Sequence, residues 1–284
     1  TTSISVFIIN LYIVKKIFMH EFILSIVFLS IGSFSSVLIY RLPLMESGKK
    51  KINLFYPRSH CPECKRSLSN KNLIPLVGYL LNYGKCSFCS HKISFIYLMN
   101  EAIHLLVGLS IFHYFGFSEI TLFSYIIFTL LYVLLILDFK FFYLPLSLNI
   151  LFIFISLISN IFFGLFISEQ SSYFNVTPAL YSFYGFMVGF FSLWLVNAVY
   201  KFFRKKDGIG GGDFILFGGI GILIGPFYLP LVLLFGSLSS LIIYLMLRKK
   251  SISDEIPLGS GLICGFFVYV FLSFYELMDN LIVL

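Results

Sequence analysis

Charged residues are scarce in this chain of 284 residues, since Asp, Glu, Lys and Arg together make up only 12% of it. A typical soluble domain carries about 25% charged residues and about 45–50% apolar ones. This chain is instead 59% hydrophobic and 19% aromatic. A soluble fold with so few charges would not cover its surface, and the apolar content is too high for a disordered chain. Composition therefore excludes ordinary soluble enzymes and disordered proteins.

Cysteine is sparse as well, and glycine has no regular period. Five Cys in the whole chain are too few for a disulfide-rich scaffold, and the 21 Gly do not repeat every third residue as in collagen. What the sequence does contain is a series of long apolar runs, with a mean hydropathy of +0.96. We therefore expect an all-α polytopic membrane protein in contact with membrane lipid.

The apolar runs predict about eight transmembrane helices, because a membrane helix needs about 20 apolar residues. The stretch 213–226 is short and rich in glycine, so it can be a broken or re-entrant segment, which is tolerated only when buried in protein or lining a water-filled cavity. The apolar stretch 4–14 is too short to span. The expected spans are 19–40, 96–115, 119–137, 144–167, 179–200, 213–226, 228–247 and 258–279.

The net charge of +7 comes from basic residues in alternate loops. Of the 20 Lys and Arg, 18 fall in the segments 41–95, 138–143, 201–212 and 248–257. The loops between these segments and the C-terminal tail carry none. Cytoplasmic loops of membrane proteins are enriched in Lys and Arg. The pattern predicts that these four segments are cytoplasmic and that both termini lie outside, and it explains the charge without a nucleic-acid partner.

Two Cys-x-x-Cys pairs lie in the first basic loop, the only one large enough to form a small domain. Each pair places two thiolates on one side of a tight turn, and two such turns can close a tetrahedral site of four sulfurs, a geometry that Zn²⁺ prefers. A closed four-cysteine site is structural. The alternatives are four free or disulfide-bonded cysteines, or a contribution from the flanking His60 and His91. The predicted ligands are Cys61, Cys64, Cys86 and Cys89.

Two aspartates mark the cytoplasmic ends of predicted spans. Asp138 ends the span 119–137 and Asp213 begins the span 213–226. Ionisable residues within spans are costly and indicate function. Two carboxylates close together share one proton, so that the ionised one can deprotonate water while the neutral one protonates a carbonyl. The alternative is that each caps a helix end or pairs with Lys140 or Lys206.

A run of glycines, Gly210, Gly211 and Gly212, directly precedes Asp213. Glycines let a backbone approach a partner closely, which supports the second aspartate as a catalytic group. A phosphate-binding loop is the rival interpretation. However, no Lys-Ser/Thr follows the glycines, and an acid at the start of a helix repels phosphate.

These motifs together resemble the type IV prepilin peptidases, the bifunctional leader peptidase/N-methyltransferases of pilus and type II secretion systems. The aspartate after Gly210–Gly212 matches the GxGD motif of these aspartyl proteases, and Asp138 followed by Leu144-Pro145 matches the first aspartate motif. The resemblance runs from about residue 22 almost to the end. Its other parts are Gly32–Phe34, Val37–Pro43, the four cysteines, Asn72–Leu76, Glu101 and Ile256–Gly259.

The resemblance implies an aspartic endopeptidase that removes the basic leader from type IV prepilins or pseudopilins at the cytoplasmic face of the bacterial inner membrane. It also implies methylation of the new N-terminus with S-adenosylmethionine as the methyl donor. The catalytic residues would be Asp138 and Asp213, supported by the glycine loop. Glu63 and Glu101 are candidates for contact with the basic leader, although Glu101 can also form a local hydrogen bond with His104.

The implied organisation has four parts. They are an N-terminal segment 1–18, a first transmembrane helix 19–41, a cytoplasmic four-cysteine zinc-binding loop domain 42–95 and a seven-helix transmembrane aspartyl peptidase core 96–284. The alternative function is a proton-coupled membrane transporter that uses the two aspartates as a relay. Such a protein usually places its acids near the midplane and often has an internal repeat, and neither is visible here. The sequence predicts no oligomeric state.

Overall fold

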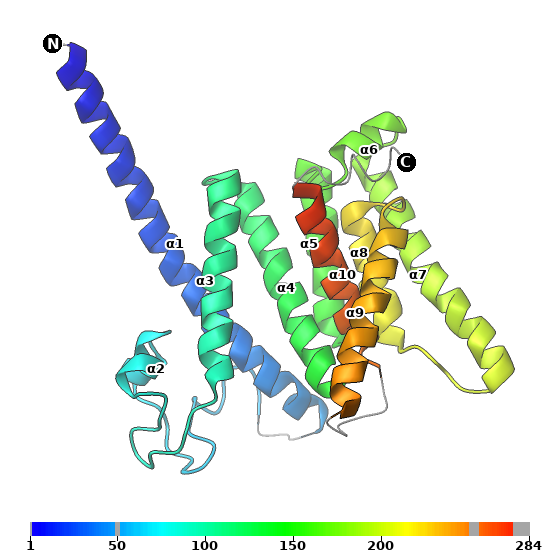
Figure 1. The fold of residues 1–284 in the computed structure, drawn as a ribbon, viewed down its shortest axis with the longest axis horizontal. Helices are drawn as coiled ribbons and strands as arrows, with labels where there is room; N and C mark the ends of the chain where they lie inside the picture. The colour runs from blue at the N-terminus through cyan, green and yellow to red at the C-terminus, as the bar shows by residue number, and fades with distance from the viewer. Residues whose placement is uncertain (1, 49–51, 250–255, 275–284) are drawn as a thin grey trace. The chain divides into compact units, whose positions relative to one another are not determined.

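A computed structural model describes residues 2–48, 52–249 and 256–274. Within these ranges the chain is helical, with two isolated β-bridges and no longer strand (Figure 1). This confirms the prediction of an all-α protein. Most of the predicted cytoplasmic segment 248–257 and the last residues of the predicted span 258–279 lie outside the described residues.

Eight helices lie where the sequence predicts spans. Six are long and apolar enough to cross a membrane, so the chain is a multi-pass membrane protein. The other two, α8 and α10, are apolar but shorter, with 14 and 17 residues. The elements are α1 (Thr2–Glu46), η1 (Asn70–Leu73), α2 (Val77–Leu81), α3 (Phe95–Phe115), α4 (Glu119–Phe141), α5 (Leu146–Phe163), α6 (Ser168–Tyr173), α7 (Pro178–Arg204), α8 (Gly211–Ile224), α9 (Leu229–Lys249) and α10 (Leu258–Phe274).

The chain forms two compact units, a first unit up to Tyr125 and a second unit from Ile126. Helix α1 begins at Thr2 and continues through the segment 1–18 without a break. The division of the chain at residues 18, 41 and 95 stays a prediction.

Small residues bring α1 and α3 together in the first unit. A Cβ on Gly32 would lie 2.9 Å from the Cα of Glu101, so no larger residue fits there. Asn100 of α3 also donates a hydrogen bond of 2.8 Å to the hydroxyl of Ser36. Interfaces of this kind are typical of membrane helices, where close van der Waals packing replaces the hydrophobic driving force.

Arg41 ties the cysteine-containing loop to the end of α1. Its guanidinium donates to the carbonyl oxygens of Asn53 at 2.8 Å and Pro57 at 2.6 Å. The side chain is buried, although the sequence places it among the basic loop residues. A buried guanidinium needs such acceptors, because an unpaired buried charge is costly. Arg41 therefore has a structural role beyond setting topology.

The second unit is built around α8, whose side chains from Leu216 to Ile224 are all buried. It packs against α5, α7 and α10. A side chain on Gly189 of α7 would lie only 2.6 Å from the carbonyl oxygen of Phe217. Burial on all sides explains how a helix too short to cross a bilayer can lie among longer ones.

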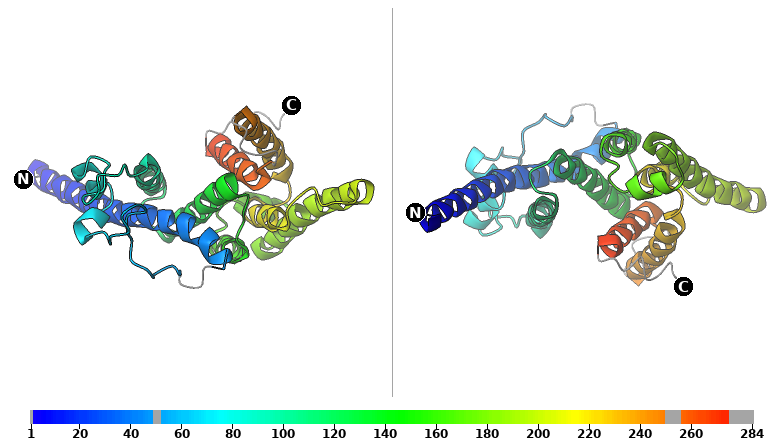
Figure 2. Two further views of the ribbon diagram at one scale, coloured as in Figure 1. Left: turned by 90° about the horizontal axis from the view of Figure 1, so that it is seen from below. Right: turned by 90° about the horizontal axis from the view of Figure 1, so that it is seen from above.

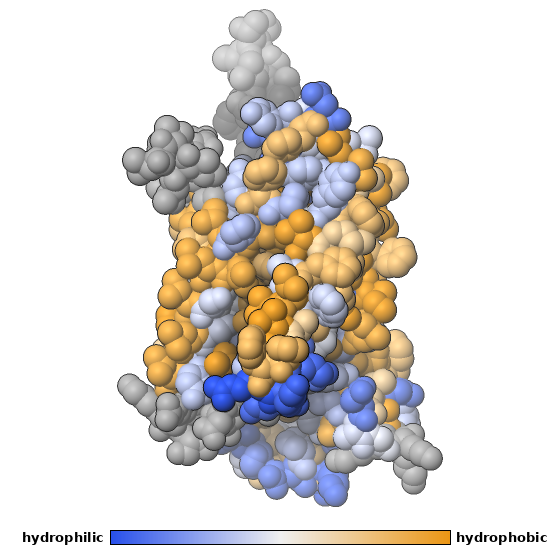
Figure 3. Space-filling model, turned by 90° about the vertical axis from the view of Figure 1, so that its right-hand side faces the viewer, coloured by the Kyte–Doolittle hydropathy of each residue, from blue (hydrophilic) through white to orange (hydrophobic). Residues whose placement is uncertain are grey.

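Helices α9 and α10 form a second tight pair, which lies side by side in all views (Figures 1 and 2). A Cβ on Gly236 of α9 would lie 3.0 Å from the Cα of Leu262. The face that Figure 3 shows is apolar across its middle, with hydrophilic residues gathered at its lower end. A helical protein with such a band of apolar surface is suited to a bilayer.

Candidate active site and metal centre

Asp138 lies in the last turn of α4, and its side chain is only 5% exposed. Its carboxylate accepts hydrogen bonds from the backbone N–H of Ser260 and from the Ser260 hydroxyl, which is 2.7 Å from Oδ2. Ser260 belongs to the first turn of α10. Asp138 thus accepts a hydrogen bond from an N–H group that has no partner within α10. This agrees in part with the alternative that each aspartate caps a helix end.

Asp213 lies in the first turn of α8 and is 9% exposed. Its backbone N–H donates to the carbonyl of Gly210 at 3.1 Å. By distance and angle, its carboxylate oxygen Oδ1 has no hydrogen-bond partner among the described residues. Buried carboxylate oxygens without a partner are unusual and point to a functional group.

The two carboxyl groups converge on Gly259, at the start of α10. A Cβ built on Gly259 would lie 3.0 Å from Oδ1 of Asp213 and 3.1 Å from Cγ of Asp138. It would also lie 2.8 Å from Leu144. Only glycine leaves room for both acids at this point. The structure therefore brings together two residues that are 75 positions apart in sequence, on α4 and α8.

Neither aspartate is neutralised by a lysine. In the described part of the chain, no ion pair joins Asp138 or Asp213 to Lys140 or Lys206. The pairing alternative is therefore wrong for the described residues. Two buried acids without a cation are expected to share a proton, because like charges at close range do not both ionise.

Asn197 of α7 holds the loop that leads into α8. Its buried amide oxygen accepts from the backbone N–H groups of Gly208 at 2.8 Å and Ile209 at 3.1 Å. Its amide nitrogen donates to Asp207 at 3.1 Å. A hydrogen bond from Lys201, helped by the one from Asn197, lowers the pKa of Asp207.

The three glycines before Asp213 have different surroundings. A Cβ on Gly212 would lie 2.8 Å from that of Leu144, and one on Gly210 would lie 3.2 Å from Oδ2 of Asp213. A Cβ on Gly211 would meet nothing within 4 Å. Close packing against Leu144 thus leaves no room for a side chain at Gly212, while one at Gly210 would make a tight contact with the Asp213 carboxyl.

The four cysteines gather in the first unit on two turns of the same design. In each turn the first cysteine accepts at its carbonyl from the residue four positions later, Lys65 or Ser90. Both of these residues have positive φ, 55° and 58°. The sulfurs of Cys61 and Cys89 are 3.7 Å apart, and all four lie within 4.8 Å of one another.

This cluster can hold a metal ion. A tetrahedron with Zn–S bonds of about 2.3 Å has sulfurs about 3.8 Å apart, close to the spacing seen here. The N–H groups of Phe88 and Cys89 lower the pKa of Cys86 to about 6. The N–H of His91 lowers the pKa of the exposed Cys89, but partial desolvation and hydrogen bonds to the other three thiols together raise it to about 11. A bound cation would stabilise all four as thiolates.

The two predicted leader contacts have unlike surroundings. Glu63 is exposed, with its carboxylate 3.9 Å from Nε2 of His91. Glu101 is buried and accepts a 2.6 Å hydrogen bond from the backbone N–H of Leu76. His104 bonds to the backbone carbonyl of Asn100. Contact of either acid with a substrate leader stays a prediction.

Sequence reasoning missed Ser260 and Asn197. A signal existed for Asn197, since an amide near the end of the apolar run 179–200 needs a polar partner. No local signal marks Ser260, because only the packing of α4 against α10 places it at Asp138.

The fold and the site define a multi-pass helical membrane protein in which two buried carboxylates meet at Gly259. Its first unit also contains a four-cysteine cluster. Two family models match the chain, the bacterial peptidase A24 N-terminal domain over residues 26–115 and the type IV leader peptidase family over residues 125–245. The chain belongs to the type IV leader peptidase family, and it is therefore an enzyme.

Curated relatives support this membership over nearly the whole chain. A prepilin leader peptidase/N-methyltransferase of Legionella pneumophila is 31% identical, covering 94% of this chain and 98% of that protein. One from Neisseria gonorrhoeae is 34% identical, covering 78% and 79%. One from Vibrio cholerae is 31% identical, covering 89% and 97%. No solved structure matches the chain significantly.

Proposed function

We propose that this protein is an aspartyl endopeptidase that removes the leader from type IV prepilins or pseudopilins and then methylates the new N-terminal amine. The observation that carries the peptidase is the convergence of Asp138 and Asp213 on Gly259. The curated relatives are named prepilin leader peptidase/N-methyltransferases, and these names suggest the substrate class and the methyl transfer. Those names also favour a peptidase over a proton-coupled transporter.

The pair can divide acid and base work. Two donors from Ser260 stabilise the ionised form of Asp138, which leaves Asp213 to hold the shared proton. Asp138 then takes a proton from water as the water oxygen attacks the scissile carbonyl carbon, and Asp213 gives its proton to the carbonyl oxygen. Collapse of the tetrahedral intermediate breaks the C–N bond, with one proton passing to the leaving amine.

The charge pattern supports a position of this chemistry at the cytoplasmic membrane surface. Asp138 is the first residue of the basic segment 138–143, and Asp213 directly follows 201–212. Both segments are cytoplasmic by the positive-inside rule, with both termini outside. A prepilin whose basic leader is cytoplasmic and whose helix is in the bilayer would present its cleavage site at this level. We propose that the protein lies in the bacterial inner membrane.

Zinc is the metal that best suits the cysteine cluster. Four thiolates at tetrahedral spacing favour Zn²⁺, and a closed four-sulfur site leaves no position for a substrate. Cys61, Cys64, Cys86 and Cys89 would hold the ion and fix the loop in the first unit. The relatives' names include N-methyltransferase, and this suggests S-adenosylmethionine as the methyl donor.

Intact-mass analysis of a purified prepilin incubated with the protein in lipid tests this function. With the enzyme alone, the substrate should lose the mass of its leader. With S-adenosylmethionine added, the mature product should gain one methyl group. An uncleaved prepilin in both reactions would contradict the peptidase assignment, and cleavage without any gain of mass would contradict the methyltransferase.

Replacing Gly259 by valine should slow cleavage by about 100-fold or more, because a side chain there displaces both carboxyl groups and misplacement by about 1 Å has effects of this size. Initial rates of leader removal measure the effect. Ser237→Val, on an exposed position of α9, adds similar bulk away from the site and should keep the wild-type rate. A Gly259→Val enzyme as fast as the control would show that the acids do not act at this point.

Replacing Asn197 by leucine should release the loop before α8 and slow cleavage by about 10-fold, with the Michaelis constant little changed. The variant removes three hydrogen bonds around Asp207, Gly208 and Ile209. Asn197→Gln and a Lys201→Met control separate the effect of the backbone contacts from that of the Lys201–Asp207 ion pair. Equal losses in Asn197→Leu and Lys201→Met would contradict a role for the amide.

A further inference from the structure

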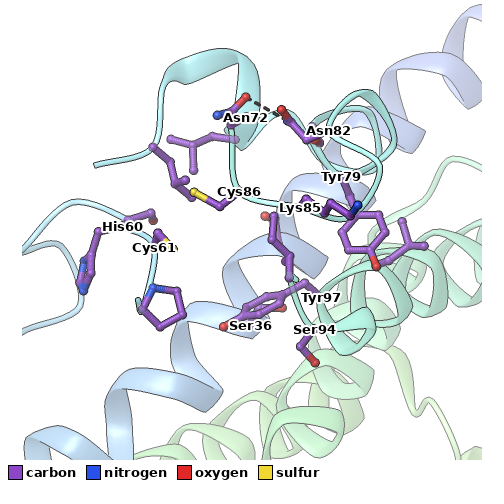
Figure 4. Close-up of a pocket in the computed structure, with 18 of the residues that line it drawn as sticks. Ser36, His60, Cys61, Asn72, Tyr79, Asn82, Lys85, Cys86, Ser94 and Tyr97 are labelled. Atoms are coloured by element: carbon purple, nitrogen blue, oxygen red, sulfur yellow. Dashed lines mark hydrogen bonds between the residues drawn. The ribbon is translucent and has the colours of Figure 1, made fainter. Parts of the chain in front are cut away.

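A cavity of about 370 Å³ lies in the first unit, between α1, the cysteine loop and the start of α3. Figure 4 shows Ser36 of α1, Tyr79 of α2, Tyr97 of α3 and the loop residue Lys85 around it. Cys61 and Cys86 form part of its wall, so the metal cluster would support one side. Ligand sites in proteins have volumes of about 300–1,000 Å³, so this cavity is large enough for a small molecule.

Glu101 supplies a buried carboxylate to the wall of this cavity. Its hydrogen-bond donors are neutral, the backbone N–H of Leu76 and the hydroxyl of Ser33. In the described part of the chain it forms no ion pair with the basic residues that also line the cavity, which are Arg41, Lys85 and Lys92. A buried carboxylate is stabilised most strongly by a cation. Glu101 is the one acidic residue among the lining residues, and its carboxylate can therefore pair with a positively charged centre of a ligand.

Aromatic rings line the same cavity. Tyr40, Tyr79 and Tyr97 all contribute to its wall. Aromatic faces attract cations and stack on planar rings such as adenine. Lys85, on the loop side, adds a positive group that can pair with a carboxylate. Together these groups suit a ligand with a cationic centre, an aromatic base and a carboxylate.

We propose that this cavity binds S-adenosylmethionine, with the Glu101 carboxylate as the counter-ion of the sulfonium and the tyrosines beside it. The proposal rests on the proposed methyl transfer and adds where the donor binds. In that transfer the amine nitrogen forms a bond to the methyl carbon, the C–S bond breaks with its electron pair going to sulfur, and the amine loses a proton. The product S-adenosylhomocysteine has no charge on sulfur, so Glu101 favours the donor over the spent product.

Equilibrium binding of radiolabelled S-adenosylmethionine and S-adenosylhomocysteine to the full-length protein in lipid, without prepilin, tests this proposal. The wild type should bind the donor more tightly. Glu101→Gln keeps an acceptor for Leu76 but removes the charge, and should weaken donor binding about 10-fold while changing product binding less than about threefold. Tyr97→Leu should weaken both. Glu119→Gln and Tyr83→Leu, at exposed positions outside the cavity, should leave both affinities unchanged.

Photo-crosslinking of the bound donor, followed by peptide mapping, gives an independent readout. Labelled peptides should come from the cavity wall, and the metal content of each variant shows that the loop is intact. Labelling elsewhere, or an equal loss of donor and product binding in Glu101→Gln, would overturn the proposal. A wild type that methylates prepilin but labels elsewhere would refute the site alone. A wild type that neither binds the donor nor methylates would refute the methyltransferase function itself.

Discussion

Asp213→Asn and Asp138→Asn should each reduce the rate of leader removal by at least about 10⁴-fold, because each substitution removes one half of an acid–base pair. Asparagine keeps the size of the side chain, so the packing against Gly259 is retained. The double variant should be no slower than either single one, since groups that act as a unit have non-additive effects.

Initial rates of prepilin cleavage at several enzyme concentrations measure these losses. Glu169→Gln, an exposed acid on α6, serves as the matched control and should retain the wild-type rate. Additive losses in the double variant, or a single variant within 10-fold of wild type, would show that the two carboxylates do not work together.

Cys86→Ser should abolish metal binding and unfold the loop between α1 and α3. Three remaining thiolates form an open site, and structural Zn²⁺ contributes about 10–16 kcal/mol in small zinc domains. The loop contains only short elements, η1 and α2, so it has little core of its own. Metal content should fall from about one ion per chain to none.

Limited proteolysis measures whether the loop between α1 and α3 unfolds in Cys86→Ser. The variant should be cut between residues 53 and 93, whereas the metal-loaded wild type should resist. Cys264→Ser, in α10 and outside the cluster, should keep both its metal and its resistance. A Cys86→Ser protein that keeps one metal ion and an intact loop would contradict the metal centre.

Much of the helical layout was predictable, because each span carries its own apolar signal. The sequence marked 213–226 as a short segment that can be broken or re-entrant, either buried in protein or lining a water-filled cavity, and α8 is buried from Leu216 to Ile224. The four cysteines were predictable for a similar reason, since each Cys-x-x-Cys turn is local and two turns suffice for the cluster.

The contacts that complete the candidate site were not predictable. Ser260 reaches Asp138 from 122 positions away, and the serine itself has no distinguishing neighbours. The role of Glu101 was left open between a local bond to His104 and a distant site, and its partner proved to be the backbone of Leu76. These contacts depend on which helices pack together, and the periodicity of a single span does not encode that choice.

We propose above all that Asp138 and Asp213 form one site that is complementary to a tetrahedral carbonyl. The most direct test is the affinity of a peptide that spans the prepilin cleavage site and carries a hydroxyl-bearing tetrahedral carbon in place of the scissile carbonyl. Transition-state analogues bind at least about 10²-fold more tightly than substrates. The wild type should show this preference, and both Asp138→Asn and Asp213→Asn should lose it while binding the plain peptide normally. Equal affinity of the wild type for the two peptides would show that Asp138 and Asp213 do not form such a site.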